Sequence, residues 1–191
     1  MKILTKEEFL DKEEFYHKEI EKGKIFVYPT DTIYGLGCDA IQPKAIKRIR
    51  EIKQRDEKPF SIIVPDKKWI FEHCIIKKDH EKYLEKLPGK FTLIIKLKNK
   101  ANIAKKELIG DFETIGVRVP DNWFAQFLSR KNLVFVTTSV NLSGQKPIKN
   151  ISELNAEIAD KVDYAIDCGE LNGKPSTLID LTKEEVEIIK R

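Results

Sequence analysis

Short apolar runs of strand length recur along the whole chain, and stretches with helical periodicity separate most of them. Strands are expected at residues 24–29, 60–64, 91–98, 114–120, 133–140, 162–167, 176–181 and 186–191. Helices are expected at residues 6–22, 43 to about 53, 66–74, 79–87, 121–130 and 152–159. No linker, repeat or low-complexity segment interrupts this alternation, so residues 1–191 are expected to form one α/β domain. Its twisted sheet, flanked by helices, is expected to mix parallel and antiparallel strands, because several C-terminal strands are too closely spaced for crossover helices.

The net charge of the chain and its cysteine and histidine residues limit the functional classes to which it can belong. The formal net charge is +4, a mild excess that is compatible with a phosphate-bearing or nucleic-acid partner. Cys38, Cys74 and Cys168 form no C-x-x-C pair and are expected to be free thiols in a reducing compartment. The three histidines lack ligand spacing, so no metal site is expected from protein side chains. Without a signal peptide or a run of membrane-spanning length, the protein is expected to be cytoplasmic and to make no membrane contact.

A cluster of hydroxyl groups follows the first long strand, in the stretch KIFVYPTDTIYGLGCDA. The polar residues just past the strand end are Thr30, Asp31, Thr32 and Tyr34. Gly35 and Gly37 after them would let the backbone approach a ligand, although this G-x-G lacks the third glycine of a dinucleotide fingerprint. A turn that satisfies its own backbone is the alternative, with Asp31 as a loop-capping carboxylate.

Three cations lie at the end of the second long helix and in the loop after it: Lys53, Arg55 and Lys58. Cations near a helix C-terminus are favourable to the helix dipole, which is sufficient to explain Lys53. Their convergence before a buried strand also suits a triphosphate, and no P-loop exists elsewhere in the chain. Lys53 and Arg55 are expected at an exposed helix end, where alanine would abolish turnover and leave the fold intact.

Two strands contain polar groups that need partners. Arg118 lies inside the apolar strand TIGVRVP, so it requires either an internal acid or a ligand carboxylate or phosphate. The strand at 133–140 ends in TTSVNLSG, where Ser139 and Asn141 would share one side of an extended backbone and bind a ligand. A capping turn is the alternative there. No histidine lies nearby to activate a serine, which argues against nucleophilic catalysis.

Taken together, these stretches resemble the YrdC family, the threonylcarbamoyl-AMP synthases of tRNA modification. The matching pieces are YPTDTIYGLGCDA, IKQR with PFSIIV, LPGKFTLI, TIGVRVP, TTSVNLSG and STLID, in family order over about residues 20 to 181. The family's K-x-R and S-x-N motifs are present as Lys53-Gln54-Arg55 and Ser139-Val140-Asn141. This chain has KQRDEKP, PGKFT and SVN where family members commonly have KGRP, PGPxT and SAN. Its length is similar to that of the short, single-domain branch.

The resemblance implies a YrdC-like fold, similar to double-stranded-RNA-binding proteins, with a basic concave groove. It also implies that the protein makes threonylcarbamoyl-AMP and pyrophosphate from L-threonine, bicarbonate or CO2, and ATP with Mg2+. The catalytic residues would be Lys53, Arg55, Ser139 and Asn141. Threonine would be bound by Thr32, Ile63, Arg118, Thr137 and Ser176. ATP would be bound by Arg55, Lys58, Thr114, Ser139, Asn141, Pro147 and Lys190, with Arg191 as the alternative to Lys190.

The product would pass to a tRNA threonylcarbamoyl transferase for the t6A modification, and a direct contact with tRNA is a further expectation. A binding module for double-stranded RNA or tRNA without catalysis is the main alternative. The lack of a Lys/Arg run with interleaved aromatics argues against it. A third alternative is a sister branch with carbamoyl-transfer chemistry, whose members usually belong to longer chains.

Overall fold

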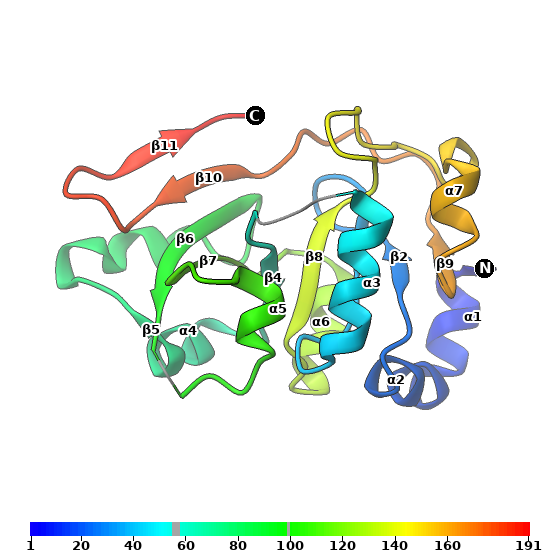
Figure 1. The fold of residues 1–191 in the computed structure, drawn as a ribbon, viewed down its shortest axis with the longest axis horizontal. Helices are drawn as coiled ribbons and strands as arrows, with labels where there is room; N and C mark the ends of the chain where they lie inside the picture. The colour runs from blue at the N-terminus through cyan, green and yellow to red at the C-terminus, as the bar shows by residue number, and fades with distance from the viewer. Residues whose placement is uncertain (55–57, 99) are drawn as a thin grey trace.

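The described part of the chain is built on one twisted sheet of eleven strands (Figure 1). Hydrogen-bonded neighbours follow the order β1-β9-β2-β3-β8-β4-β7-β6-β10-β11, while β5 pairs with β6 outside this order. The computed structural model describes residues 1–54, 58–98 and 100–191. The strands are β1 (Lys2–Thr5), β2 (Phe26–Tyr28), β3 (Gly35–Gly37), β4 (Ser61–Ile63), β5 (Cys74–Ile75), β6 (Phe91–Leu97), β7 (Thr114–Arg118), β8 (Phe135–Ser139), β9 (Tyr164–Asp167), β10 (Thr177–Asp180) and β11 (Glu187–Ile189). The sheet combines parallel pairs such as β4–β7 with antiparallel pairs such as β6–β7, which confirms the mixed sheet.

The α-helices are α1 (Lys6–Asp11), α2 (Glu13–Glu21), α3 (Pro43–Lys53), α4 (Lys67–His73), α5 (Lys105–Ile109), α6 (Trp123–Arg130) and α7 (Ala156–Ala159). Two segments, η1 (Lys78–Lys86) and η2 (Ile151–Glu153), are 3-10 helices. The local sequence explains where several of these helices begin. Thr5 and Glu8 form a reciprocal capping box, Pro43 occupies the first turn of α3, and Asn122 accepts a hydrogen bond from the backbone of Ala125.

Side chains from the two faces of the sheet form two hydrophobic clusters. In β2, Val27 packs into the cluster that includes the inner face of α3, whereas its neighbour Phe26 packs into the other. Figure 1 shows α3 in front of β8 and α6 behind it. The second cluster is rich in aromatic rings, such as Phe9 and Phe127, whose centroids lie 5.0 Å apart. Because both faces are covered, the central strands contain runs of apolar residues, which is why they were predictable.

Several predicted elements were wrong in type or extent. The predicted helix 6–22 is interrupted at Lys12, and the break accompanies the stacking of Phe9 on Tyr16. The segment 79–87 belongs to a 3-10 helix, and 152–159 is divided between η2 and α7. The stretch Gly35–Gly37, predicted as part of a loop, is strand β3 between β2 and β8.

Besides β3, the elements β1, β5 and α5 were not predicted. They have five residues or fewer and carry too little periodicity to detect. Among the described residues, no helix is both long and apolar enough to span a membrane.

Candidate functional site

A pocket of about 270 Å³ lies where the loop after β2, the end of β7, the end of β8 and the start of β10 come together. Hydroxyl-bearing residues dominate its described lining: Thr30, Thr32, Tyr34, Ser61, Thr92, Thr137, Thr138, Ser139 and Ser176. The charged residues of this lining are Arg118 and Arg191, and no acid is among them. The pocket therefore offers many hydrogen-bonding groups in a positive field, which suits an anionic ligand.

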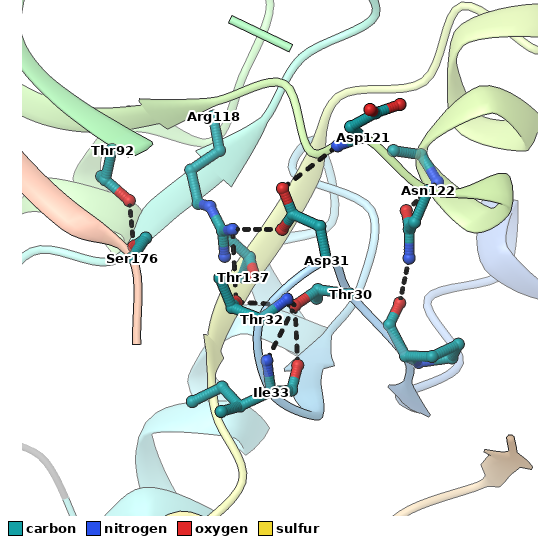
Figure 2. Close-up of polar contacts among 12 residues, drawn as sticks. Thr30, Asp31, Thr32, Ile33, Thr92, Arg118, Asp121, Asn122, Thr137 and Ser176 are labelled. Carbon is teal, nitrogen blue, oxygen red and sulfur yellow. Dashed lines mark hydrogen bonds and ion pairs between the residues drawn. The ribbon is translucent and has the colours of Figure 1, made fainter. Parts of the chain in front are cut away.

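Arg118 is held by an internal carboxylate at one end of the pocket (Figure 2). Its Nη2 donates to Asp31 Oδ1 at 2.8 Å, and the two side chains are only 8% and 4% exposed. Burial lowers the pKa of Arg118, and Asp31 opposes this shift. The Arg118 Nε is buried without a partner among the described residues. A buried N–H left without an acceptor costs about 1–3 kcal/mol, so this guanidinium is suited to an acceptor supplied from outside the protein.

The hydroxyls beside Arg118 form a directed chain of hydrogen bonds. Thr30 Oγ1 donates its only proton to the Ile33 carbonyl at 2.7 Å, so Thr32 must donate to Thr30 across the 2.9 Å between their hydroxyl oxygens. The Thr32 oxygen in turn accepts from Arg118 Nη2 at 3.4 Å. The predicted turn, in which side chains bond the loop's own backbone, is thus present in part, and its hydrogen bonds orient Thr32 beside Arg118.

The opposite wall is formed by the start of β10 and the C-terminal residue. Arg191 Nη2 donates to Ser176 Oγ at 2.9 Å, and the Thr92 and Ser176 hydroxyl oxygens lie 2.7 Å apart. Burial of the guanidinium, followed by the charge of Arg118, lowers the pKa of Arg191. The two arginines therefore repel each other across the pocket, and an anion between them would relieve this repulsion.

The segment 169–176 runs across the molecule from β9 to β10 (Figure 1). At Gly173 it packs closely against the backbone of Thr32. A Cβ added to Gly173 would lie 1.9 Å from the Thr32 carbonyl oxygen, so only glycine fits this approach. A Cβ added to Gly37 would likewise lie 2.0 Å from the Val136 carbonyl oxygen. The expectation that Gly37 admits a ligand was therefore wrong, because the protein's own backbone occupies that space.

Lys53 is buried, contrary to the expectation of an exposed helix end, with 3% exposure. Its Nζ donates to the Ser139 carbonyl at 2.7 Å, and to the Asn141 carbonyl and Oδ1 at 2.6 Å each. Ser139 Oγ also donates to Asn141 Oδ1 at 2.6 Å. The structure thus brings the K-x-R lysine and the S-x-N motif together, and the lysine holds the turn in place. The other member of the K-x-R motif, Arg55, lies outside the described residues.

The remaining predicted residues are spread over different surroundings. Thr137 lines the pocket and accepts a hydrogen bond from Tyr28 Oη at 2.6 Å. Ile63 packs into the aromatic-rich cluster and Thr114 begins β7, and neither is part of the pocket lining. Lys58 and Lys190 are exposed and also outside the lining. Pro147 lines the pocket and also a neighbouring hollow that Asn141 shares.

Sequence reasoning did not assign Asp31, Thr30, Thr92 or Gly173 to the site. For Asp31 a signal existed, because a buried arginine requires an acid and Asp31 follows a strand end. Gly173 gave no signal, since its close approach to Thr32 depends on the tertiary fold. No group of three or more His, Cys, Asp or Glu that could hold a metal ion exists within residues 1–54, 58–98 and 100–191.

Comparisons with known proteins place this site in context. A family model, Sua5_yciO_yrdC, described as "Telomere recombination", matches residues 18–191. A Methanocaldococcus jannaschii protein named "Putative threonylcarbamoyl-AMP synthase" is 37% identical over 183 residues, which cover 93% of this chain and 84% of the relative.

Two solved structures have a similar fold. The P. abyssi Sua5 structure in complex with L-threonine is 26% identical with a TM-score of 0.85, and covers 98% of this chain. This chain spans about half of that Sua5, 56% of its length. The E. coli YciO structure is 29% identical with a TM-score of 0.81, over 91% of this chain and 85% of YciO. These likenesses confirm the predicted YrdC-like fold.

Proposed function

The chain belongs to the family of Sua5, YciO and YrdC proteins, and we propose that its pocket makes threonylcarbamoyl-AMP and pyrophosphate from L-threonine, bicarbonate or CO2, and ATP. The protein is accordingly a nucleotidyltransferase that serves the t6A modification of tRNA. One observation carries the proposal. Arg118 and Arg191 face one hydroxyl-lined pocket whose described lining contains no acid. A substrate carboxylate and several phosphates, bound together, require such cations and hydrogen-bond donors.

The amino acid fits the end of the pocket formed by Arg118 and Thr32. A guanidinium binds a carboxylate through charge-assisted hydrogen bonds, and Arg118 keeps donors beyond the one used by Asp31. The Thr32 hydroxyl is oriented by the chain of bonds through Thr30, so its position is defined before a ligand arrives. The named ligand of the similar Sua5 structure, L-threonine, is of this class.

The reaction needs charge stabilisation more than proton transfer. The threonine amine attacks bicarbonate or CO2 to form an N–C bond and a carbamate anion, with loss of water from bicarbonate, or with release of an amine proton to solvent when CO2 reacts. A carbamate oxygen then bonds to the α-phosphorus of ATP, and the bond to the β-phosphate oxygen breaks to release pyrophosphate. The nucleophile is already an anion, so no histidine base is required. Arg191 and the predicted cation Arg55 would stabilise the phosphates and the departing pyrophosphate.

The S-x-N turn would form the nucleotide side of the pocket. Ser139 lines the pocket, and Lys53 holds its carbonyl and both Asn141 oxygens. Lys58, Thr114 and Lys190 stay predictions as ATP ligands. Mg2+ would be bound mainly by phosphate oxygens and water, since the described residues offer no acidic cluster. We place the protein in the cytoplasm, where the product passes to a tRNA threonylcarbamoyl transferase, with direct tRNA contact as a separate proposal.

The proposal is tested by following pyrophosphate release from ATP by the purified protein. Release should require L-threonine and bicarbonate together, and should fall to the background rate when either is omitted. Release that continues without threonine would refute the synthase activity. Tight, steeply salt-dependent binding of double-stranded RNA with no turnover would favour the binding module instead.

A further inference from the structure

We propose that Asp31 is a positioning residue for the amino-acid substrate, acting through Arg118 and never touching the substrate itself. This inference rests on the proposed function, because it assumes that Arg118 receives the substrate carboxylate. Asp31 is outside the described lining of the pocket, whereas Arg118, Thr30 and Thr32 are part of it. Asp31 therefore lies behind the group that meets the ligand.

The geometry shows what Asp31 holds in place. One of its oxygens accepts from Arg118 Nη2 at 2.8 Å, and the other accepts from the backbone N–H of Asp121 at 3.2 Å (Figure 2). The carboxylate thus links the loop after β2 to the loop that follows β7. The first loop is itself tied to the start of α6, because Asn122 Nδ2 donates to the Pro29 carbonyl at 2.7 Å. Asp31 sits at the centre of a junction that is fixed on both sides.

Without this junction the arginine would have several poses. Among the described residues, Arg118 donates to Asp31 and, over a longer distance, to Thr32, while its Nε has no partner there. A long side chain held mainly by one carboxylate loses its orientation when that carboxylate is removed. Small displacements of a binding group have large effects on a reaction that depends on positioning. If Arg118 moved, the Thr32 hydroxyl would also lose the hydrogen bond that it accepts from Arg118 Nη2.

Charge provides the second argument. Arg118 and Arg191 both face the pocket, and the pKa of Arg191 is lowered first by burial and then by the charge of Arg118. Asp31 neutralises one of these two cations from behind. Without its charge the pocket would attract anions more strongly but less selectively, so phosphate groups would compete for the end that the amino acid uses. Asp31 therefore favours a ligand with one carboxylate at Arg118 over a ligand that is wholly phosphate.

Asp121 supplies a matched control on the same junction. Asp121→Asn makes the same change of charge at a neighbouring loop residue, but the Asp121 side chain is exposed and is not among the described hydrogen-bond partners of Arg118. Figure 2 shows its carboxylate turned away from the arginine. Its contribution to the junction is a backbone N–H, which the substitution retains. A difference between Asp31→Asn and Asp121→Asn thus measures the contact and not the charge alone.

The experiment measures pyrophosphate release and L-threonine binding without ATP, for the whole protein. Asp31→Asn should raise KM for L-threonine, and weaken its binding by calorimetry, by about tenfold or more, while KM for ATP stays within about twofold. Inorganic phosphate should inhibit this variant more strongly than the wild type. Asp31→Glu should lie between the two, because it keeps the charge but moves its oxygens by one carbon. A merely structural role would change both KM values together, whereas a lower melting temperature is expected in either case because a buried ion pair is broken.

Three outcomes decide the inference. Equal threonine KM values for Asp31→Asn and Asp121→Asn would overturn it, as would parallel changes in the KM values for threonine and ATP. If Asp31→Asn does not fold, Asp31→Glu takes its place, and a threonine KM equal to that of the wild type would overturn the inference. Failure of the proposed function is distinct, because the wild type itself would then show no threonine-dependent pyrophosphate release.

Discussion

Replacing Lys53 by alanine should destabilise the protein, although sequence reasoning predicted that this variant would keep its fold. The substitution removes a buried ammonium group that donates to two carbonyls and one side-chain oxygen, at 2.6 to 2.7 Å. A hydrogen bond from a charged donor contributes about 1.5–3 kcal/mol. The three bonds share one ammonium and water can replace part of them, so the expected loss is about 3 kcal/mol, well below the sum.

The assay is reversible thermal unfolding followed by circular dichroism. For a domain of this size, about 3 kcal/mol lowers the melting temperature by about 6–12 °C. Lys53→Met keeps the apolar stem and removes the donor, so it should show most of the same loss. Lys47→Ala on the same helix is the control, because its side chain is 66% exposed and its ion pair with Glu107 spans 3.8 Å. Exposed pairs contribute about 0–1 kcal/mol.

The result that would refute this reasoning is a Lys53→Ala variant that melts within about 2 °C of the wild type. In that case the three bonds would contribute little to stability, and Lys53 would be available to bind substrate. Loss of activity together with loss of stability would instead support a lysine that acts by holding Ser139 and Asn141. Activity measured well below the melting temperature separates the two effects.

Three further variants test other parts of the structure. Gly173→Ala should lower threonine binding by about tenfold by calorimetry, since the new Cβ would lie 1.9 Å from the Thr32 carbonyl oxygen and must displace one of the two segments. Arg191→Met should reduce pyrophosphate release by about tenfold or more, because it removes a pocket cation, and an unchanged rate would exclude Arg191 from the site. The hydrogen bond from Lys22 is the main cause of the lowered pKa of Glu19, so that carboxylate stabilises the fold above its unfolded pKa near 4.5 and loses this effect as pH falls through the lowered value. Glu19→Gln should therefore lose less stability than the wild type during acid titration followed by fluorescence.

The central strands were predictable because each one contains its own apolar run, which can be recognised without knowing its neighbours in the fold. The runs 133–136 and 62–64 lie in covered strands of the sheet, so they appear as continuous apolar stretches. The strand Gly35–Gly37 was missed for the converse reason: glycine has low strand propensity, and only pairing with β2 and β8 makes this segment a strand. The short edge strand β1 depends in the same way on its partner β9.

The site was predictable as a set of residue types but not as a set of contacts. Arg118 illustrates the limit. An arginine in an apolar strand must have an acidic or anionic partner, yet its partner, Asp31, is 87 residues away in the sequence. Lys53 illustrates the opposite case, because a cation at a helix end is usually solvated and nothing in KQRDEKP indicates burial. In each case the sequence indicates the kind of partner that a charge requires, and only the fold decides whether the protein or the substrate supplies it. Asp31 supplies it for Arg118 before a ligand arrives, which is why the arginine can be both buried and ready to bind.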